Sequence, residues 1–212
     1  MRKYEKIDTI FARDINGTKK LMPNVFRDET VAFLANIPWQ WTEKVDGTNV
    51  RIIWDGHSVS FAGRTDNSVL PEALNFRLWS LFGGSTNEEM FEQLFGDKEV
   101  ILFGEGYGHK IQKCGSQYSN DVKFILFDVL IGDNYQSRSF VETIARSLNI
   151  DVVPILGTGT LDQAIEFVKS KPDSIVAQNP LTIEGVVCRP VVELRDRCGN
   201  RIIVKIKVCD FE

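Results

Sequence analysis

The sequence predicts a mixed α/β fold with several β-hairpins, and three observations support this prediction. Apolar and polar residues alternate along short runs at 39–45 and 50–54, which is the two-residue period of a half-buried strand. Asp-Gly pairs at 46–47 and 55–56 follow such runs, and glycine permits a tight reversal there. Apolar residues recur at helical spacing within 71–95. We therefore expect hairpins of short strands combined with separate helices.

The N-terminal segment carries little regular pattern. Residues 1–26 are polar, so we expect an irregular stretch anchored to the body of the protein by Ile7, Ile10 and Phe11. A short helix is predicted over 28–36, because a proline stands two residues beyond its end.

Two hairpins are predicted next. In the first, the Asp-Gly pair at 46–47 turns the chain, so that Lys44 would lie at the mouth of a sheet on firmly held backbone. In the second, the Asp-Gly pair at 55–56 forms a two-residue turn between strands at 50–54 and 58–62.

The middle of the chain predicts two helices and two strands. The helical region 71–95 is split by adjacent glycines, and Thr86 with Glu89 forms a capping box for its second half. A short apolar strand follows at 99–103. Residues 122–131 form a nearly continuous apolar run that indicates a buried strand. Its periodicity places Phe124 and Phe127 on opposite faces.

The C-terminal third repeats this mixture. Capping boxes open helices at 139–148 and 160–170, and a polar linker follows at 170–180. Strands are predicted within 182–190 and 202–208.

The final strand carries two lysines on one face. Alternation sets Lys205 and Lys207 on the side opposite the apolar residues between them. Like charges on one face of a strand repel, unless an anion lies between them. A solvated surface pair is the alternative interpretation.

Composition limits the function classes. The 212 residues, at 24.0 kDa, fit one domain, and no apolar run is long enough for a signal core or a membrane span, which predicts a cytoplasmic protein. A net charge of −4 disfavours a binding module that relies on general attraction to nucleic acid. The cysteines form no CxxC pair, so no zinc or redox motif is indicated.

Six short motifs occur in one order along the chain: Lys44-Val45-Asp46-Gly47, Arg64, Phe103-Gly104-Glu105, Phe127-Asp128, Glu184-Gly185 and Lys205-Ile206-Lys207. In type and order they resemble motifs I, Ia, III, IIIa, IV and V of the covalent nucleotidyltransferases, the polynucleotide ligases and mRNA capping enzymes. Asn49 lies five residues after the lysine. In this respect the chain resembles the RNA ligase branch, because DNA ligases and capping enzymes usually have arginine there.

This resemblance implies an α+β nucleotidyltransferase fold. Two mainly antiparallel sheets with flanking helices would enclose a nucleotide cleft. Residues 1–212 would form a single adenylylation domain, without the C-terminal accessory domain of larger relatives.

The resemblance also implies a reaction. The Lys44 amine would attack the α-phosphate of ATP to form lysyl-AMP, the AMP would pass to a 5′-phosphate end, and a 3′-hydroxyl would then seal the strand. The attack requires a neutral amine, which we expect burial behind Trp39 and Trp41 and repulsion by Lys205 and Lys207 to favour.

The residues that the resemblance assigns fall into three sets. The catalytic set comprises Lys44, Glu184, Lys205 and Lys207. The ATP-binding set comprises Glu43, Lys44, Val45, Asn49, Arg51, Arg64, Glu105, Phe127, Glu184, Lys205 and Lys207. Within it, Glu43 would accept from the adenine amine, Glu105 would contact the ribose, Phe127 would stack on the purine, and Arg64 would hold phosphates or the substrate strand. Glu184 and Glu105 would hold Mg²⁺ or Mn²⁺ through water.

Several functions remain open on the sequence. An ATP-dependent RNA ligase acting on RNA ends or nicks is the first hypothesis. Alternatives are a DNA or end-repair ligase, a capping guanylyltransferase, and a catalytically silent nucleic-acid-binding domain. The intact lysines and Glu184 weigh against a silent domain, and the net charge weighs against a pure binder. A protein partner could supply the accessory domain.

Overall fold

The computed structural model describes residues 2–14, 17–18 and 20–212, and it confirms the α+β class. Within these ranges, no helix is long and apolar enough to cross a membrane. The chain divides into two compact units, each made of three segments. Unit 1 comprises Met1–Tyr4, Asp46–Val153 and Ala177–Asn179. Unit 2 comprises Glu5–Val45, Pro154–Val176 and Pro180–Glu212. The single domain over 1–212 stays a prediction.

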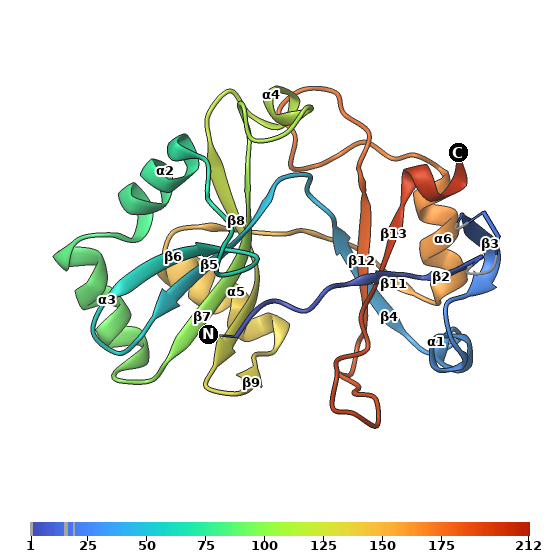
Figure 1. Cartoon of the computed structure of the whole chain (residues 1–212), viewed down its shortest axis with the longest axis horizontal. Coiled ribbons are helices and arrows are strands. Elements are labelled where there is room, and N and C mark those ends of the chain that lie inside the picture. Colours follow the sequence, from blue (N-terminus) through green and yellow to red (C-terminus); the bar gives the residue numbers. More distant parts are fainter. Residues whose placement is uncertain (1, 15–16, 19) are drawn as a thin grey trace. The chain divides into compact units, whose positions relative to one another are not determined.

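Unit 1 is built on a sheet with the strand order β10-β8-β7-β5-β6, and β9 pairs with β8 (Figure 1). Its strands are β5 (Thr48–Trp54), β6 (Val59–Gly63), β7 (Val100–Tyr107), β8 (Lys123–Ile131), β9 (Asn134–Tyr135) and β10 (Asp151–Val152). All pairs are antiparallel except β10 with β8. Its helices are α2 (Glu72–Phe82), α3 (Ser85–Phe95), α4 (Gly115–Tyr118) and α5 (Arg138–Ser147). Apolar side chains of α2, α3 and α5 form one buried core with those of the sheet.

The two predicted helices over 71–95 are confirmed, but the predicted capping box is wrong. Helix α3 begins at Ser85 with Gly84 as its N-cap, and no side chain caps it. Thr86 therefore lies inside the first turn, where its hydroxyl cannot serve as an N-cap.

The β5–β6 hairpin is confirmed, with a longer loop than predicted. Trp54 pairs with Val59, so residues 55–58 form the turn. The Asp55 carboxylate accepts hydrogen bonds from the backbone N–H groups of His57 and Ser58 at 2.9 and 2.8 Å. Gly56 has φ of +95°, which glycine adopts without steric cost. The Asp-Gly pair thus turns the chain as its type predicts.

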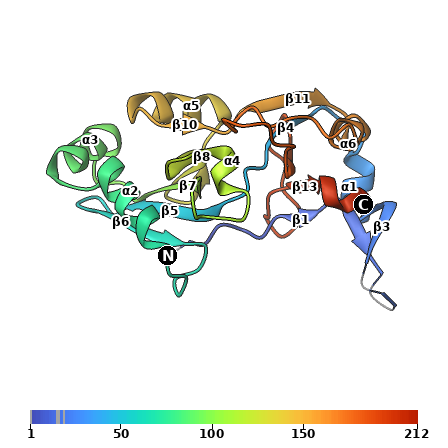
Figure 2. The ribbon, with the colours of Figure 1, turned by 90° about the horizontal axis from the view of Figure 1, so that it is seen from above.

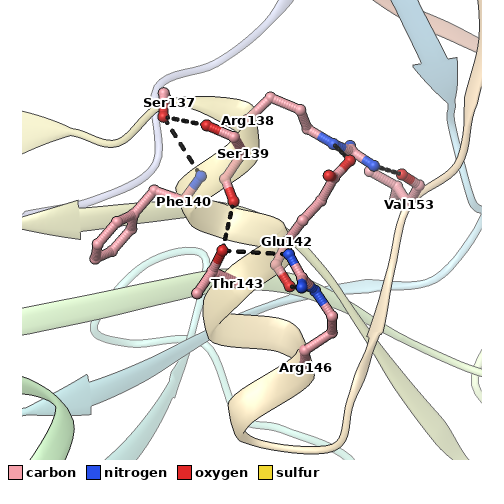
Figure 3. A network of polar contacts seen from close by, with 8 residues as sticks. All are labelled: Ser137, Arg138, Ser139, Phe140, Glu142, Thr143, Arg146 and Val153. Atoms are coloured by element: carbon pink, nitrogen blue, oxygen red, sulfur yellow. Dashed lines mark hydrogen bonds and ion pairs between the residues drawn. The ribbon is translucent and has the colours of Figure 1, made fainter.

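Helix α5 begins with a polar network (Figure 3). Ser137 is its N-cap and accepts from the Phe140 N–H, so the helix starts slightly earlier than the predicted capping box. The Arg138 guanidinium donates to Glu142 Oε1 and to the carbonyl oxygen of Val153, both at 2.7 Å. Arg138 therefore ties the start of α5 to the end of the long segment of unit 1.

Unit 2 contains a sheet with the order β1-β13-β12-β4-β11 and a separate β2–β3 pair. The strands are β1 (Asp8–Thr9), β2 (Phe11–Arg13), β3 (Leu21–Phe26), β4 (Trp39–Glu43), β11 (Ile155–Gly159), β12 (Gly185–Pro190) and β13 (Val204–Lys207). The helices are α1 (Glu29–Leu34), α6 (Leu161–Lys169) and the 3₁₀ turn η1 (Val208–Phe211). Figure 2 shows α6 beside β11. Apolar residues of α1, α6 and the sheet form the second core.

The prediction of an irregular segment over 1–26 is wrong, since β1, β2 and β3 lie within it. β1 pairs in parallel with β13, almost two hundred residues away, so local alternation could not reveal it. Ile10 and Phe11 are buried anchors as predicted, whereas Ile7 is only partly buried. Positions 1, 15, 16 and 19 lie outside the described residues.

The predicted hairpin at Lys44 is also wrong. β4 pairs with β11 and β12, whereas β5 pairs with β6 and β7. A Cβ atom on Gly47 would lie 2.8 Å from Glu105 Cγ and closer still to the carbonyl oxygen of Gly106. Glycine is thus needed here for close approach to β7 and not for a turn.

Candidate functional site

Unit 2 brings three of the predicted residues into one charged cluster, formed by Lys44, Glu184 and Lys207. The Lys44 amine lies 2.5 Å from Glu184 Oε2, and the Lys207 amine bonds the other oxygen, Oε1. The three side chains are 24, 21 and 30% exposed. One partly buried carboxylate therefore joins the candidate nucleophile to a lysine at the end of the chain's last strand.

Strand register delivers these side chains. Gly185 lies opposite Lys207, and Val187 lies opposite Lys205. The Lys44 N–H donates to the Gly185 carbonyl at 3.0 Å, which continues the β4–β12 ladder to Lys44. A Cβ on Gly185 would lie 2.8 Å from Lys207 Cα and closer still to the carbonyl of Ile206. The glycine of the Glu-Gly pair thus lets the backbone carrying Glu184 approach β13.

Charge in the cluster shifts three pKa values. Burial opposes ionisation of Glu184, but the pairs with Lys44 and Lys207 outweigh it and lower the pKa of Glu184. Burial would lower the pKa of Lys207, but its bond to Glu184 raises it. The pKa of Lys205 is lowered by burial and then by repulsion from Lys207 and Lys44. Lys207 and Lys44 therefore repel Lys205, and a bound anion would relieve that repulsion.

Glu43 points to the other side of this sheet. Its side chain is 2% exposed, and it accepts hydrogen bonds from Ser174 Oγ and, at 3.1 Å, from the Ile175 N–H. Burial outweighs these bonds and raises the pKa of Glu43. Trp39 and Trp41 share this buried side, so the expectation that they bury the Lys44 amine is wrong. No feature of the sequence marked Ser174 as a partner of Glu43.

Unit 1 places three other predicted residues on one face of its sheet. Asn49 lies opposite Glu105, and Arg51 lies opposite Phe103, whereas Val50 belongs to the core on the other face. Asn49 Oδ1 is buried without a hydrogen-bond partner among the described residues. Buried acceptors are rarely left unpaired, so this atom fits a ligand contact.

Arg51 is fully buried and its contacts are with protein groups. Its Nε donates to the Gly63 carbonyl at 2.8 Å, and its Nη2 donates to Asp66 Oδ1 at 2.7 Å. Its Nη1 lies 3.3 Å from the carbonyl of Arg2. Arg64 itself is exposed in the loop after β6.

Phe127 and Phe124 have different surroundings, in line with the prediction of opposite faces. Phe124 belongs to the core with the helices. Phe127 is half-buried, and its ring centroid lies 5.0 Å from that of Tyr4 in a T-shaped arrangement. The Tyr4 hydroxyl in turn donates to Asp128 Oδ2 at 2.9 Å. Tyr4 of the N-terminal segment thus packs against the predicted purine-stacking residue. The sequence could not predict this contact, because the two residues are far apart along the chain.

The first motif has parts in both units. Val45 is buried in unit 2, while the Asp46 N–H of unit 1 donates to the Tyr118 hydroxyl at 3.3 Å. Tyr118 is 1% exposed and carried no sequence signal.

The donor set fits only a hydrated metal ion. The described residues hold no group of three or more His, Cys, Asp or Glu side chains suited to a metal. Glu184 and Glu105 are single carboxylates in different units. Mg²⁺ and similar ions keep several waters and use few carboxylates together with substrate phosphates, a chemistry that is compatible with either carboxylate alone.

Comparison with known proteins gives a family and a fold. The family model described as RNA ligase matches residues 37–207. No curated protein sequence matches the chain. Three similar solved structures are variants of Naegleria gruberi RNA ligase, one without nucleotide and two with ATP and Mn. The first has a TM-score of 0.62 and 19% identity, and covers 86% of this chain and 52% of that chain. The second has a TM-score of 0.67 and 16% identity, and it covers 100% of this chain and 57% of that chain. The third has a TM-score of 0.64 and 19% identity, and it covers 99% of this chain and 62% of that chain.

The chain spans between 52 and 62% of the length of those three chains. At such low identity the likeness shows the fold, which is the one the motifs predict.

Proposed function

The chain belongs to the RNA ligase family, whose model spans residues 37–207, and from this premise we propose that it is an ATP-dependent RNA ligase. The observation that carries the proposal is the cluster in which Glu184 joins Lys44 to Lys207. Structures of Naegleria gruberi RNA ligase with ATP and Mn support ATP as the nucleotide and a divalent ion as cofactor.

The first step would be attack by the Lys44 amine on the α-phosphorus of ATP. An N–P bond forms, the P–O bond to pyrophosphate breaks, and the amine proton passes to solvent. Lys205 and Lys207 neutralise the charge that develops on the phosphate oxygens, where phosphoryl-type transfer gains most. The pKa of Lys205 is lowered first by burial and then by repulsion from Lys207 and Lys44, and an incoming phosphate would relieve that repulsion. A divalent ion held through water by Glu184 would add Lewis-acid stabilisation of these oxygens.

The remaining predicted residues would recognise the nucleotide. Asn49 and Glu105 share one sheet face, and Phe127 presents a half-buried ring. The adenine contact predicted for Glu43 has no support in this geometry, because its carboxylate is buried on the side of the sheet opposite Lys44 and already accepts from Ser174 and Ile175. Val45, next to the nucleophile, would contribute apolar packing.

Transfer of AMP to a 5′-phosphate and closure by a 3′-hydroxyl would complete the reaction. Arg64 is exposed and would bind the phosphate backbone of the strand. RNA ends or nicks are the proposed substrates. A partner protein with a nucleic-acid-binding domain would add the positive charge that a chain of net charge −4 lacks.

The test is incubation with α-labelled ATP and Mg²⁺, followed by denaturing electrophoresis. Wild-type protein should retain one acid-stable AMP, and Lys44→Ala should lose the label while remaining folded. Lys6→Ala, at a side chain 72% exposed, is the matched control and should label normally. Undiminished label on Lys44→Ala would remove the proposal.

The choice between RNA and DNA has its own test. Four nicked duplexes differing only in the sugars beside the break should show a need for ribose on the 3′-hydroxyl side. Loss of one bond to a 2′-hydroxyl should slow sealing by roughly 5- to 150-fold. Equal sealing of the all-DNA nick would favour the DNA or end-repair ligase instead.

A further inference from the structure

The proposed reaction leaves one conspicuous charge without a direct part in it. Arg51 is 0% exposed, although arginine is almost never fully buried unless it is paired. Its neighbours are protein groups on three sides, which separates its guanidinium from bulk solvent. A buried charge of this kind is costly, so its retention calls for a reason beyond stability.

We infer that Arg51 is a positioning residue that holds the loop carrying Arg64 in the conformation that binds the RNA strand. This inference rests on the proposed function. The Nε bond reaches Gly63, immediately before Arg64, and the Nη2 bond reaches Asp66, two residues after it. One rigid, planar donor group therefore grips the loop on both sides of Arg64.

The loop also closes on itself beyond Asp66. The Ser68 N–H donates to the Thr65 carbonyl at 3.0 Å, and the hydroxyls of the two residues lie 2.6 Å apart. Arg51 connects this closed turn to strand β5 inside the sheet. The Arg64 backbone lies in a loop held on both sides, so this backbone loses little freedom when the side chain binds an anion.

The same contact controls charge beside Arg64. Asp66 stands two residues away and is 54% exposed. With Oδ1 held by Arg51 at 2.7 Å, this carboxylate is neutralised by a buried partner. Without Arg51, Asp66 would be available to pair with Arg64 and would repel the phosphates of the strand. Arg51 thus keeps the neighbouring acid away from the strand-binding arginine.

The consequence is specific to one step. The adduct forms on Lys44, whereas the loop held by Arg51 carries Arg64, which is assigned to the strand and not to the nucleotide. Loosening the loop should therefore slow sealing of a pre-adenylylated RNA nick and leave lysyl-AMP formation largely unchanged. A purely structural role for Arg51 would lower both activities together.

The experiment uses Asp66→Ala, which releases the loop at a half-exposed position and keeps Arg51 in place. Its expected phenotype is lysyl-AMP labelling within about twofold of wild type and sealing of a pre-adenylylated nick slowed by about tenfold, the loss of one charge-assisted bond. Asp66→Asn keeps an acceptor oxygen, so its rate of sealing should lie between those of wild type and Asp66→Ala. Lys3→Ala is the matched control, because Lys3 lies 3.7 Å from the same carboxylate but does not grip the loop. It should behave as wild type in both assays.

A second measurement needs no ligase activity. Trypsin should cleave after Arg64 several-fold faster in Asp66→Ala than in wild type or Lys3→Ala. Normal sealing with unchanged cleavage in Asp66→Ala would overturn the inference, as would a loss of labelling that exceeds the loss of sealing. If wild-type protein neither labels nor seals, the proposed function fails, and unchanged trypsin cleavage would then reject the loop contact separately.

Discussion

Glu184 is the residue on which the charge balance of unit 2 depends. Its carboxylate serves Lys44 and Lys207 at once, and all three side chains are less than a third exposed. Glu184→Gln would leave two ammonium groups with one neutral acceptor. We expect this substitution to lower the free energy of unfolding by about 1–3 kcal/mol near neutral pH. Lysyl-AMP formation should fall more than tenfold, because the bond that orients the amine is weakened.

The lowered pKa of Glu184 fixes the sign of a pH effect. Its folded-state pKa lies below the ordinary value of 4.5, because the pairs with Lys44 and Lys207 outweigh burial. The stability that it contributes is therefore complete above that value and is lost as pH falls through the lowered pKa. Denaturant titrations should show a constant gap between wild type and Glu184→Gln from about pH 7 to 5 that narrows below about pH 4. A gap that widens in acid would contradict this assignment.

Asn49 gives a prediction in which stability and activity move apart. An orphaned buried acceptor such as its Oδ1 costs about 1–3 kcal/mol, and valine suits a strand well. Asn49→Val should therefore unfold at the same or a higher denaturant concentration while it seals RNA nicks more slowly. Thr48→Val, at the preceding position of β5, serves as control and should seal normally. A variant that loses stability but keeps wild-type sealing would show that Oδ1 has no ligand role.

At the scale of elements, Gly185 sets the distance between β12 and β13. Any side chain there meets the backbone of Ile206 and Lys207, which cannot move aside as a flexible side chain can. Gly185→Ala should cost about 1–3 kcal/mol of unfolding free energy, the usual range for overpacking. It should also reduce AMP labelling, because Glu184 would shift away from Lys207. Gly132→Asn, in an open turn at φ of +56°, should leave labelling of the folded protein unchanged, and equal labelling of the two variants would refute the role of Gly185.

The elements that sequence could predict are those fixed by neighbouring residues. The turn at Asp55-Gly56, the break between α2 and α3 and the capping box of α6 all rest on local chemistry, and all are present. The Asp-Gly pair at 46–47 has the same letters, yet the strands beside it pair with other partners. A dipeptide signals that the chain can reverse, and long-range pairing decides whether it does.

In the candidate site, too, sequence predicts what neighbouring residues fix and misses what long-range contacts fix. Alternation alone placed Lys205 and Lys207 together, as the register confirms. The shared bonds of Glu184 and the grip of Arg51 on Asp66 depend on residues that meet only in the fold. Buried polar partners such as Ser174 and Tyr118 leave no periodic trace, so spacing could not reveal them.

For the whole molecule, a net charge of −4 predicts weak dependence of RNA binding on salt. The proposed strand and phosphate contacts involve Lys44, Arg64, Lys205 and Lys207, so few counterions are released. A plot of log binding constant against log salt concentration should have a slope of roughly −3 to −4. Fluorescence anisotropy with a nicked RNA duplex at several salt concentrations would measure it. A slope much steeper than about −6 would reveal cations beyond this set.

The distribution of strands along the chain orders their appearance during synthesis. All strands of the sheet in unit 1 come from residues 48–152, so this sheet can be completed before β12 and β13 have been made. The sheet of unit 2 must wait, because Asp8 pairs with Val204 and β4 needs β12. Lys44 is made early but acquires Glu184 and Lys207 only after the last strand has emerged. A nascent chain thus carries Lys44 unassembled until residue 207 has been made, and the nucleophile gains its partners last.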